Sequence, residues 1–314
     1  MPSCNILINL KNPIDAFCLK PRHLDLLQAA LPQARIEVAE TRERFLEKLP
    51  EAECALVWNF RPEWYPLAPR LRTLFTPAAG NDWVASDPSG RVRTVYGRFH
   101  GRIMRESLLS MMLYFTRRVG RSLSDQQSRV WGRNGYSSCT ALFSQQVLII
   151  GCGALGCSIA ELLKAFGCRV VGVRRTPQLG AVPHLDRMVA FADLEAELPA
   201  ADHVVLLLPG GETTNGIITA RHFSLMKQGA FLYNLGRGNC YAEADLLAAL
   251  AGGPLAGAGL DVFAQEPLPP ESALWQLPNL LITPHASAIS QEYLDLFLQD
   301  WLRDLTTLHD ITVR

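Results

Sequence analysis

Short apolar runs alternate along most of the chain with segments whose apolar residues recur at helical intervals. The runs are rich in branched side chains, which is typical of strands that are buried on both faces of a parallel sheet. In the N-terminal part the pattern predicts strand, helix, strand, helix, strand and strand, over residues 5–10, 22–31, 34–39, 42–49, 54–58 and 71–75. This order predicts a small parallel sheet.

The same alternation continues in the second half of the chain. It predicts further strands over residues 147–150, 170–173, 203–208, 230–234, 257–262 and 280–283. It predicts helices over residues 101–119, 193–198, 221–227, 243–251 and 291–308. We therefore expect an α/β protein of two domains, with the first boundary just before the helix 101–119. We also expect the last helix to return and cover the N-terminal domain.

The stretch 147–176 combines a buried strand, a glycine-rich turn, a helix and a second buried strand. This is the context that a dinucleotide-binding fingerprint requires. In the G-x-G-x-x-G spacing, Gly151 makes the tight turn, Gly153 lets the backbone approach a pyrophosphate, and Gly156 allows close packing of helix on strand. The helix N-terminus adds amide donors and a positive dipole for the phosphates. The alternative is a glycine turn without a ligand.

Charge and composition exclude several classes of protein. The 30 Lys and Arg residues balance the 30 Asp and Glu residues, so no basic segment points to nucleic acid or a membrane surface. No signal peptide and no apolar run of membrane-spanning length is present. The eight cysteines form no metal-binding spacing, so we expect reduced thiols, no metal and a cytoplasmic location. Cys152 and Cys157 lie in the glycine loop, where we interpret them as small space-filling residues rather than reactive thiols.

Three polar residues stand at the ends of later predicted strands: Arg237 in LYNLGRG, Glu266 in LDVFAQEPLP and His285 in LLITPHAS. Because the carboxyl ends of parallel strands meet at one edge of a sheet, these side chains can converge on a bound nicotinamide. Arg237 has the planar fork that matches a carboxylate. His285 can exchange protons near neutrality, and Glu266 can orient its ring. Singly, each also fits an ordinary role as a surface charge, a loop acid or a core histidine.

A loop of small residues, 76–82, follows the predicted strand 71–75. Its sequence TPAAGND would leave backbone amides exposed to a ligand. Loops of this kind lie at the carboxyl ends of parallel strands, where ligands bind. We therefore expect the amides of Ala78, Ala79 and Gly80 to contact the substrate.

From about Phe99 to Ser287 the sequence resembles the D-isomer-specific 2-hydroxyacid dehydrogenases. The resemblance lies in GRFHGRIMRES, GCGALGCSIAELLKAFG, NLGRG, GAGLDVFAQEPLP and ALWQLPNLLITPH. It implies two Rossmann-like doubly wound domains with a cleft between them: a flavodoxin-like substrate-binding domain, 1–98 plus 289–314, and a dinucleotide-binding domain, 99–288. It also implies a homodimer joined through the cofactor domains, with the helix 101–119 involved.

The resemblance implies Arg237, Glu266 and His285 as the catalytic residues. Arg237 would hold the carboxylate of a 2-oxo acid, and His285, held by Glu266, would protonate the forming alkoxide. Asp261 would contact the nicotinamide carboxamide, and Leu208 with Pro209 would line the cofactor cleft. The full expected cofactor set is Gly151, Gly153, Ala154, Leu155, Gly156, Arg174, Arg175, Thr176, Leu208, Pro209, Leu235, Gly236, Arg237, Asp261 and His285.

One position departs from the NAD-binding pattern. NAD-binding members carry an acid at the end of the second strand, which bonds the ribose 2′-hydroxyl. Here that position is Arg174, followed by Arg175 and Thr176. Two guanidinium groups and a hydroxyl would bind a 2′-phosphate, so we predict NADP(H) in preference to NAD(H). The alternative is a solvated arginine pair at a strand end.

The substrate is less well specified by the sequence. In its predicted use of NADP and its short substrate domain, the chain is similar to the glyoxylate/hydroxypyruvate reductases. Formate dehydrogenases of this fold have a glutamine where this chain has Glu266, which argues against formate as the substrate. Candidates to line the pocket are Arg61 and Trp275, followed by Trp58, Trp64 and Trp83, each of which could equally be a packing or surface residue. Two alternatives stay open: a dehydrogenase for a larger 2-hydroxy acid, and a dinucleotide-sensing binding protein like the corepressors of this fold.

Overall fold

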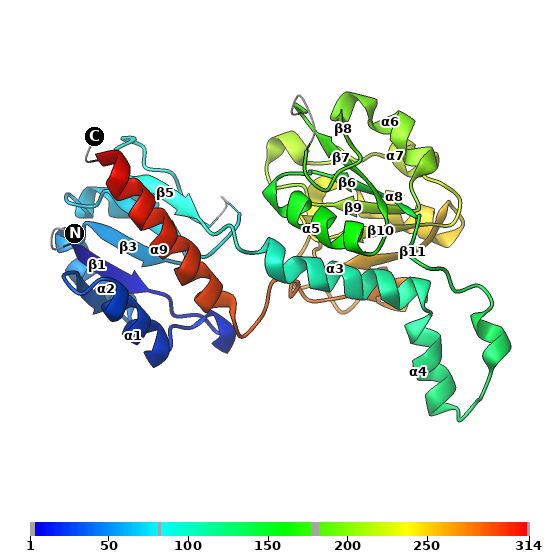
Figure 1. Ribbon diagram of the computed structural model, residues 1–314, viewed down its shortest axis with the longest axis horizontal. Helices are drawn as coiled ribbons and strands as arrows, with labels where there is room; N and C mark the ends of the chain where they lie inside the picture. The colour runs from blue at the N-terminus through cyan, green and yellow to red at the C-terminus, as the bar shows by residue number, and fades with distance from the viewer. Residues whose placement is uncertain (1–3, 81–82, 178–181, 313–314) are drawn as a thin grey trace. The chain divides into compact units, whose positions relative to one another are not determined.

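The computed structural model describes residues 4–80, 83–177 and 182–312, with side chains as far as residue 304. The chain divides into two compact units (Figure 1). The first unit consists of Met1–His100 and Ile289–Arg314, and the second of Gly101–Ala288. Each unit contains one parallel sheet, so the predicted α/β class with two parallel sheets is confirmed. No helix among the described residues is both long and apolar enough to span a membrane.

The sheet of the first unit has the strand order β2-β1-β3-β4-β5, and every pair of neighbours is parallel. This is the doubly wound order of flavodoxin-like folds. The elements are β1 (Asn5–Asn9), α1 (Pro21–Ala30), β2 (Arg35–Val38), α2 (Arg42–Lys48), β3 (Cys54–Val57), β4 (Thr73–Thr76), β5 (Arg93–Tyr96) and α9 (Tyr293–Thr312). The strand β5 was missed because it is short and follows a loop with no clear apolar alternation.

Aromatic side chains fill much of the core of this unit. Phe45 of α2 packs with Phe60 and Trp64, with ring centroids 5.4–6.3 Å apart. Trp301 of α9 packs on Phe75 of β4, with ring centroids 5.6 Å apart. The C-terminal helix therefore covers the first unit, as the sequence predicts.

The sheet of the second unit has the order β12-β11-β10-β9-β6-β7-β8, again with parallel neighbours. Its strands are β6 (Gln146–Ile150), β7 (Arg169–Arg174), β8 (Arg187–Ala190), β9 (His203–Leu206), β10 (Ala230–Asn234), β11 (Leu255–Leu260) and β12 (Leu280–Ile282). Its helices are α3 (Gly101–Thr116), α4 (Val119–Gln127), α5 (Ala154–Ala165), α6 (Leu194–Glu197), α7 (Ala220–Leu225) and α8 (Glu243–Ala251). From β6 the chain turns first to β7 on one side and later to β9 on the other. In open parallel sheets, ligands bind outside the carboxyl ends of the strands at this reversal.

The predicted helix 101–119 is wrong at its C-terminal end. The helix α3 stops at Thr116, and Arg118 adopts a left-handed conformation with φ 53°. A second helix, α4, then extends away from the sheet of its unit (Figure 1). The sequence did not predict α4, a short helix in which no residue is buried against a core. The strand β8 at the sheet edge was missed as well.

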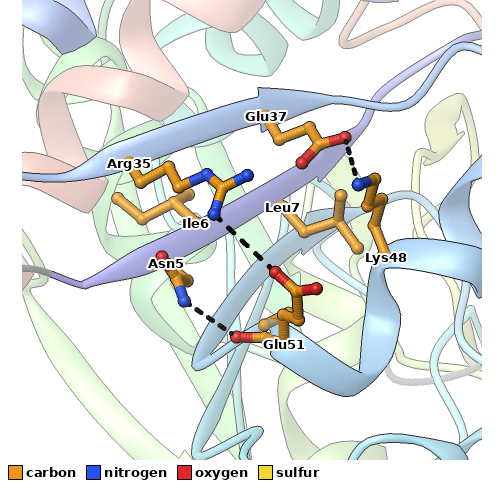
Figure 2. A pocket seen from close by; sticks show the side chains of 8 residues that line it. Asn5, Ile6, Leu7, Arg35, Glu37, Lys48 and Glu51 are labelled. Carbon is orange, nitrogen blue, oxygen red and sulfur yellow. Dashed lines mark hydrogen bonds and ion pairs between the residues drawn. The ribbon is translucent and has the colours of Figure 1, made fainter.

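A small crevice opens at the beginning of β1 and β2 in the first unit (Figure 2). Its charged side chains pair with one another: Arg35 Nη1 lies 3.7 Å from Glu51 Oε2, and Lys48 Nζ lies 3.7 Å from Glu37 Oε1. Asn5 Nδ2 donates to the Glu51 carbonyl at 3.2 Å. The crevice contains none of the predicted site residues. The predicted site residues instead follow the carboxyl ends of the strands.

Candidate active site

Glu266 and His285 form a hydrogen-bonded pair beyond the ends of β11 and β12. His285 Nδ1 lies 2.7 Å from Glu266 Oε2, and the Phe263 amide donates to Glu266 Oε1 at 2.9 Å. The carboxylate is thus fixed on both oxygens. Both side chains keep solvent contact, with 43% of His285 and 35% of Glu266 exposed. Because Nδ1 is bonded to a carboxylate, Nε2 is the ring nitrogen that can exchange a proton with a substrate.

The loop that carries Arg237 packs directly on the segment that carries Glu266. A methyl group at Gly238 would lie 1.9 Å from the carbonyl carbon of Phe263, so only glycine permits this approach. Arg237 Nη1 donates to the Gly236 carbonyl at 2.9 Å, and its side chain lies against Gly210. The strands β10, β11 and β12 are neighbours, so the three predicted catalytic residues follow three adjacent strands.

Asn234, the last residue of β10, shapes the Arg237 loop from inside. It is fully buried. Its Oδ1 accepts from the Gly236 amide at 3.0 Å, and its Nδ2 donates to the Arg237 carbonyl at 3.1 Å. One amide side chain therefore satisfies both a donor and an acceptor of this turn. This residue was not among the predicted site residues, although a polar residue at the end of a buried strand is a signal that could have indicated it.

Asp261 shapes the His285 loop in the same way. Its Oδ1 accepts from Thr283 Oγ1 at 2.5 Å and from the Ala286 amide at 2.8 Å, and its Oδ2 accepts from the Ser287 amide at 3.0 Å. The side chain is fully buried, and its own carbonyl accepts from the His285 amide at 2.8 Å. These bonds hold His285 in a left-handed conformation with φ 51°. The contact of Asp261 with a nicotinamide stays a prediction, and the structure adds a role in the loop.

The glycine loop between β6 and α5 has the geometry of the predicted fingerprint. Gly151 has φ 88°, and a Cβ there would lie 2.8 Å from the Leu207 carbonyl oxygen. Gly153 precedes the first turn of α5, and a Cβ there would meet no atom within 4 Å. Gly156 packs closely on β6 through Ile149. The turn therefore leaves open space at the helix N-terminus, which fits a pyrophosphate.

Cys152 of this loop fills space, as predicted, and Cys157 lies in α5 and is half-buried. Cys152 is completely buried, and its Sγ would lie within 3.0 Å of a Cβ at Gly156 or Gly172. Burial, with the neighbouring Cys157 thiol, raises the pKa of Cys152 to about 12. A thiol with this pKa stays protonated at neutral pH and is unreactive.

The arginines proposed to bind the 2′-phosphate stand at the end of β7. Arg174 is the last residue of the strand and is partly exposed, and Arg175 and Thr176 are exposed. Neither arginine forms an ion pair or a side-chain hydrogen bond with any residue that the structure describes. Within the described part of the chain, no acidic side chain neutralises them, so both charges can meet an anion.

The other predicted cofactor residues also follow sheet strands. Leu208 and Pro209 come after β9, and Leu235 and Gly236 after β10. Leu208, Leu235 and Gly236 are buried, whereas Pro209 is exposed. Trp275 is half exposed, and its Nε1 donates to the Pro269 carbonyl at 2.9 Å, a few residues beyond Glu266.

In the first unit, the loop after β4 is only partly available to a ligand. The Ala78 amide donates to Thr76 Oγ1 at 3.3 Å, and Ala78 is buried. The amides of Ala79 and Gly80 have no partner among the described residues, and Ala79 is exposed. Asn81 and Asp82 lie outside the described residues.

The other pocket candidates of this unit have ordinary structural contacts. Trp58 and Trp64 are core residues, which favours packing over substrate contact. Arg61 Nη1 lies 3.7 Å from Glu63 Oε1, and its guanidinium stacks on Trp64. Trp83 is half exposed. A substrate role for Arg61 or Trp83 stays a prediction.

The family model described as D-isomer specific 2-hydroxyacid dehydrogenase, NAD binding domain, matches residues 109–287, which is more than half of the chain. The chain belongs to the D-isomer specific 2-hydroxyacid dehydrogenases. The resemblance stated from the sequence is confirmed, and the protein is an oxidoreductase with an NAD-binding domain.

Individual relatives span most of this dehydrogenase. A glyoxylate/hydroxypyruvate reductase A from Salmonella dublin is 34% identical over 283 residues, covering 85% of each chain. A solved family member from Aeromonas salmonicida is 32% identical with a TM-score of 0.82, covering 98% of this chain and 96% of its own. An NADPH-dependent glyoxylate/hydroxypyruvate reductase from Sinorhizobium meliloti, solved with NADP and sulfate, is 29% identical with a TM-score of 0.77, covering 94% and 92%.

The bonds of Asp261 predict the effect of removing its charge. In Asp261→Asn, the side-chain NH₂ group would take the place of an oxygen that accepts a hydrogen bond from the His285 loop. Two hydrogen-bond donors would then point at each other. We expect kcat to fall about 100-fold, because His285 is displaced. The free energy of unfolding should fall by about 1–3 kcal/mol. Steady-state kinetics and thermal unfolding measure both.

Asp202→Asn is the matched control. The Asp202 carboxylate also accepts from a backbone amide, that of Gln146, at 2.8 Å, but it lies before β9 at the other end of the sheet. It should lose stability and keep kcat. A wild-type kcat in Asp261→Asn would show that the loop does not depend on this carboxylate.

Proposed function

We propose that this dehydrogenase reduces a small 2-oxo acid, of the glyoxylate or hydroxypyruvate type, to the D-2-hydroxy acid with NADPH. The observation that carries the proposal is the Glu266–His285 pair, whose carboxylate is fixed by the Phe263 amide beside the Arg237 loop. A carboxylate-binding guanidinium after β10 and a proton donor after β12 then lie on either side of the Glu266 segment that follows β11.

Each of the three residues has a distinct role in this proposal. A bound reduced nicotinamide supplies the hydride for C2 of the substrate. Arg237 binds the substrate carboxylate with its guanidinium fork and stabilises the negative charge that develops on the carbonyl oxygen. His285 gives its Nε2 proton to that oxygen, and Glu266 keeps the ring in the orientation that this transfer needs.

The preference for NADPH rests on the end of β7. Arg174 and Arg175 have no acidic partner among the residues that the structure describes. An acid at this position would bond a ribose 2′-hydroxyl and repel a phosphate, whereas arginine favours the phosphate. The Sinorhizobium meliloti relative, which is described as NADPH-dependent, agrees with this choice.

We propose residues 1–98 with 289–314 as the substrate-binding domain and 99–288 as the dinucleotide-binding domain. The Ala79 and Gly80 amides would contact the substrate, because they lack partners among the described residues. The name of the Salmonella dublin relative supports a substrate of two or three carbons.

We also propose a homodimer in which the segment after α3 takes part. This segment, which we call the arm, covers residues 117–136. Four of its large apolar side chains are exposed by 38% to 92%: Val119, Leu123, Val130 and Trp131. Large apolar side chains that are exposed close together in one segment are typical of protein interfaces.

The proposed acid predicts the effect of removing His285. In His285→Ala, kcat for glyoxylate reduction should fall about 10²- to 10⁴-fold, since no group remains to protonate the alkoxide. The Kd for NADPH should stay within about twofold. Steady-state kinetics and fluorescence titration measure the two quantities. Unchanged turnover would assign the proton to another group.

The cofactor proposal predicts a change of preference in Arg174→Asp. Loss of a charged phosphate contact should lower kcat/KM for NADPH about 10- to 100-fold and favour NADH. Arg169→Asp, at the other end of β7, is the control and should leave the preference unchanged. If Arg174→Asp keeps the wild-type ratio of kcat/KM for NADPH to kcat/KM for NADH, the 2′-phosphate is bound elsewhere.

If the arm forms the dimer interface, charges placed on it should change the oligomeric state. The double variant Leu123→Asp with Trp131→Asp should shift the mass in light scattering from dimer to monomer, because charges would replace the buried apolar contacts. Leu67→Asp, at an exposed apolar residue of the first unit, should leave the mass unchanged. A wild-type mass in the double variant would exclude the arm from the interface.

A further inference from the structure

The side chain of Tyr293 is buried at the start of α9, and its hydroxyl has two partners. It donates to the Pro77 carbonyl at 3.2 Å, and it lies 3.0 Å from His100 Nε2. Since a hydroxyl has one proton and the carbonyl can only accept, His100 must donate from Nε2. The ring of Tyr293 packs against Phe17 and Phe99, with ring centroids 4.4 and 4.7 Å away.

The Pro77 carbonyl stands at the base of the loop that carries Ala79 and Gly80. Gly97, just after β5, permits its position, because a Cβ there would lie 2.4 Å from this oxygen. The Gly97 amide also donates to the Ala78 carbonyl at 3.1 Å. Two successive carbonyls of the loop, those of Pro77 and Ala78, are therefore bonded to other segments of the first unit.

The partners of Tyr293 lie where the chain leaves and re-enters the first unit. His100 is the last residue before the chain passes to the second unit, and the chain returns at Ile289. The Tyr293 hydroxyl thus joins both connecting segments to the base of the loop. Burial lowers the pKa of His100 to about 4, so its ring is neutral near pH 7. The network therefore keeps one protonation state over the physiological range.

We infer that Tyr293 is a positioning residue that holds the Pro77–Gly80 loop in the conformation that binds the substrate carboxylate. This inference rests on the proposed function of that loop. Without the hydroxyl, the buried Pro77 carbonyl and His100 Nε2 would each lose a partner. Loop conformations that expose the carbonyl to water would then gain population. The apparent affinity for the substrate then falls in proportion to the fraction of molecules whose loop has the substrate-binding conformation.

The test is Tyr293→Phe, which removes the hydroxyl and keeps the ring in its aromatic cluster. We expect KM for glyoxylate or hydroxypyruvate to rise about 5- to 10-fold. We expect kcat and the Kd for NADPH to stay within about twofold, because Arg237, Glu266 and His285 are untouched. Deuterium exchange of the peptide that contains residues 77–80 should become faster.

Tyr233→Phe is the matched control. Tyr233 is also completely buried, and its hydroxyl lies 3.2 Å from a buried histidine, His203 Nδ1, in the second unit. This variant should lose stability by a similar amount and change neither KM nor exchange at residues 77–80. An equal increase of KM in both variants would show that Tyr293 contributes only to the stability of the fold and does not position the loop.

The two readouts separate this inference from the proposed function. If the wild-type protein reduces no 2-oxo acid, the proposed function fails. Faster deuterium exchange at residues 77–80 in Tyr293→Phe would then still show that the Tyr293 hydroxyl stabilises the loop conformation. If the wild type is active, an unchanged KM in Tyr293→Phe overturns the inference. Unchanged exchange overturns it in either case.

Discussion

The close packing of Gly238 on Phe263 is the constraint on which the site depends. Because no side chain stands between these two backbones, the Arg237 loop touches the segment whose amide fixes Glu266. Glu266 in turn fixes Nδ1 of His285. Backbone contacts thus hold the side chains of three residues from distant parts of the sequence in fixed positions. These are a guanidinium, a carboxylate and an imidazole.

Buried polar residues at the strand ends support this arrangement. Asn234 and Asp261 are both fully buried. Asn234 bonds to the Arg237 loop that it precedes, and Asp261 bonds to the His285 loop, which follows the neighbouring strand β12. A buried carboxylate is costly unless several donors meet it, and Asp261 has three. The conformation of the His285 loop, including its left-handed residue, is therefore over-determined and can be maintained without a bound ligand.

The sequence predicted the features that depend on local pattern. Apolar runs and helical intervals located most elements to within a few residues, and β10 and α8 match their predicted bounds. The elements that were missed, α4, β5 and β8, lack a buried stripe or lie at a sheet edge. The loop contacts of Asp261 and Tyr293 could not be predicted, because their partners lie far away in the chain, as Pro77 does from Tyr293. The contacts of Asn234 are local, and its position at the end of a buried strand is a signal that was missed.

The most direct test is to follow nicotinamide absorbance with glyoxylate, hydroxypyruvate, pyruvate and longer 2-oxo acids, with NADPH and NADH in parallel, and to determine the configuration of the product. We predict rapid oxidation of NADPH with a two- or three-carbon acid, slower oxidation of NADH, and D-glycerate from hydroxypyruvate. No oxidation across the panel, in a protein that still binds NADPH, would contradict a 2-oxo acid reductase and favour a dinucleotide-sensing protein.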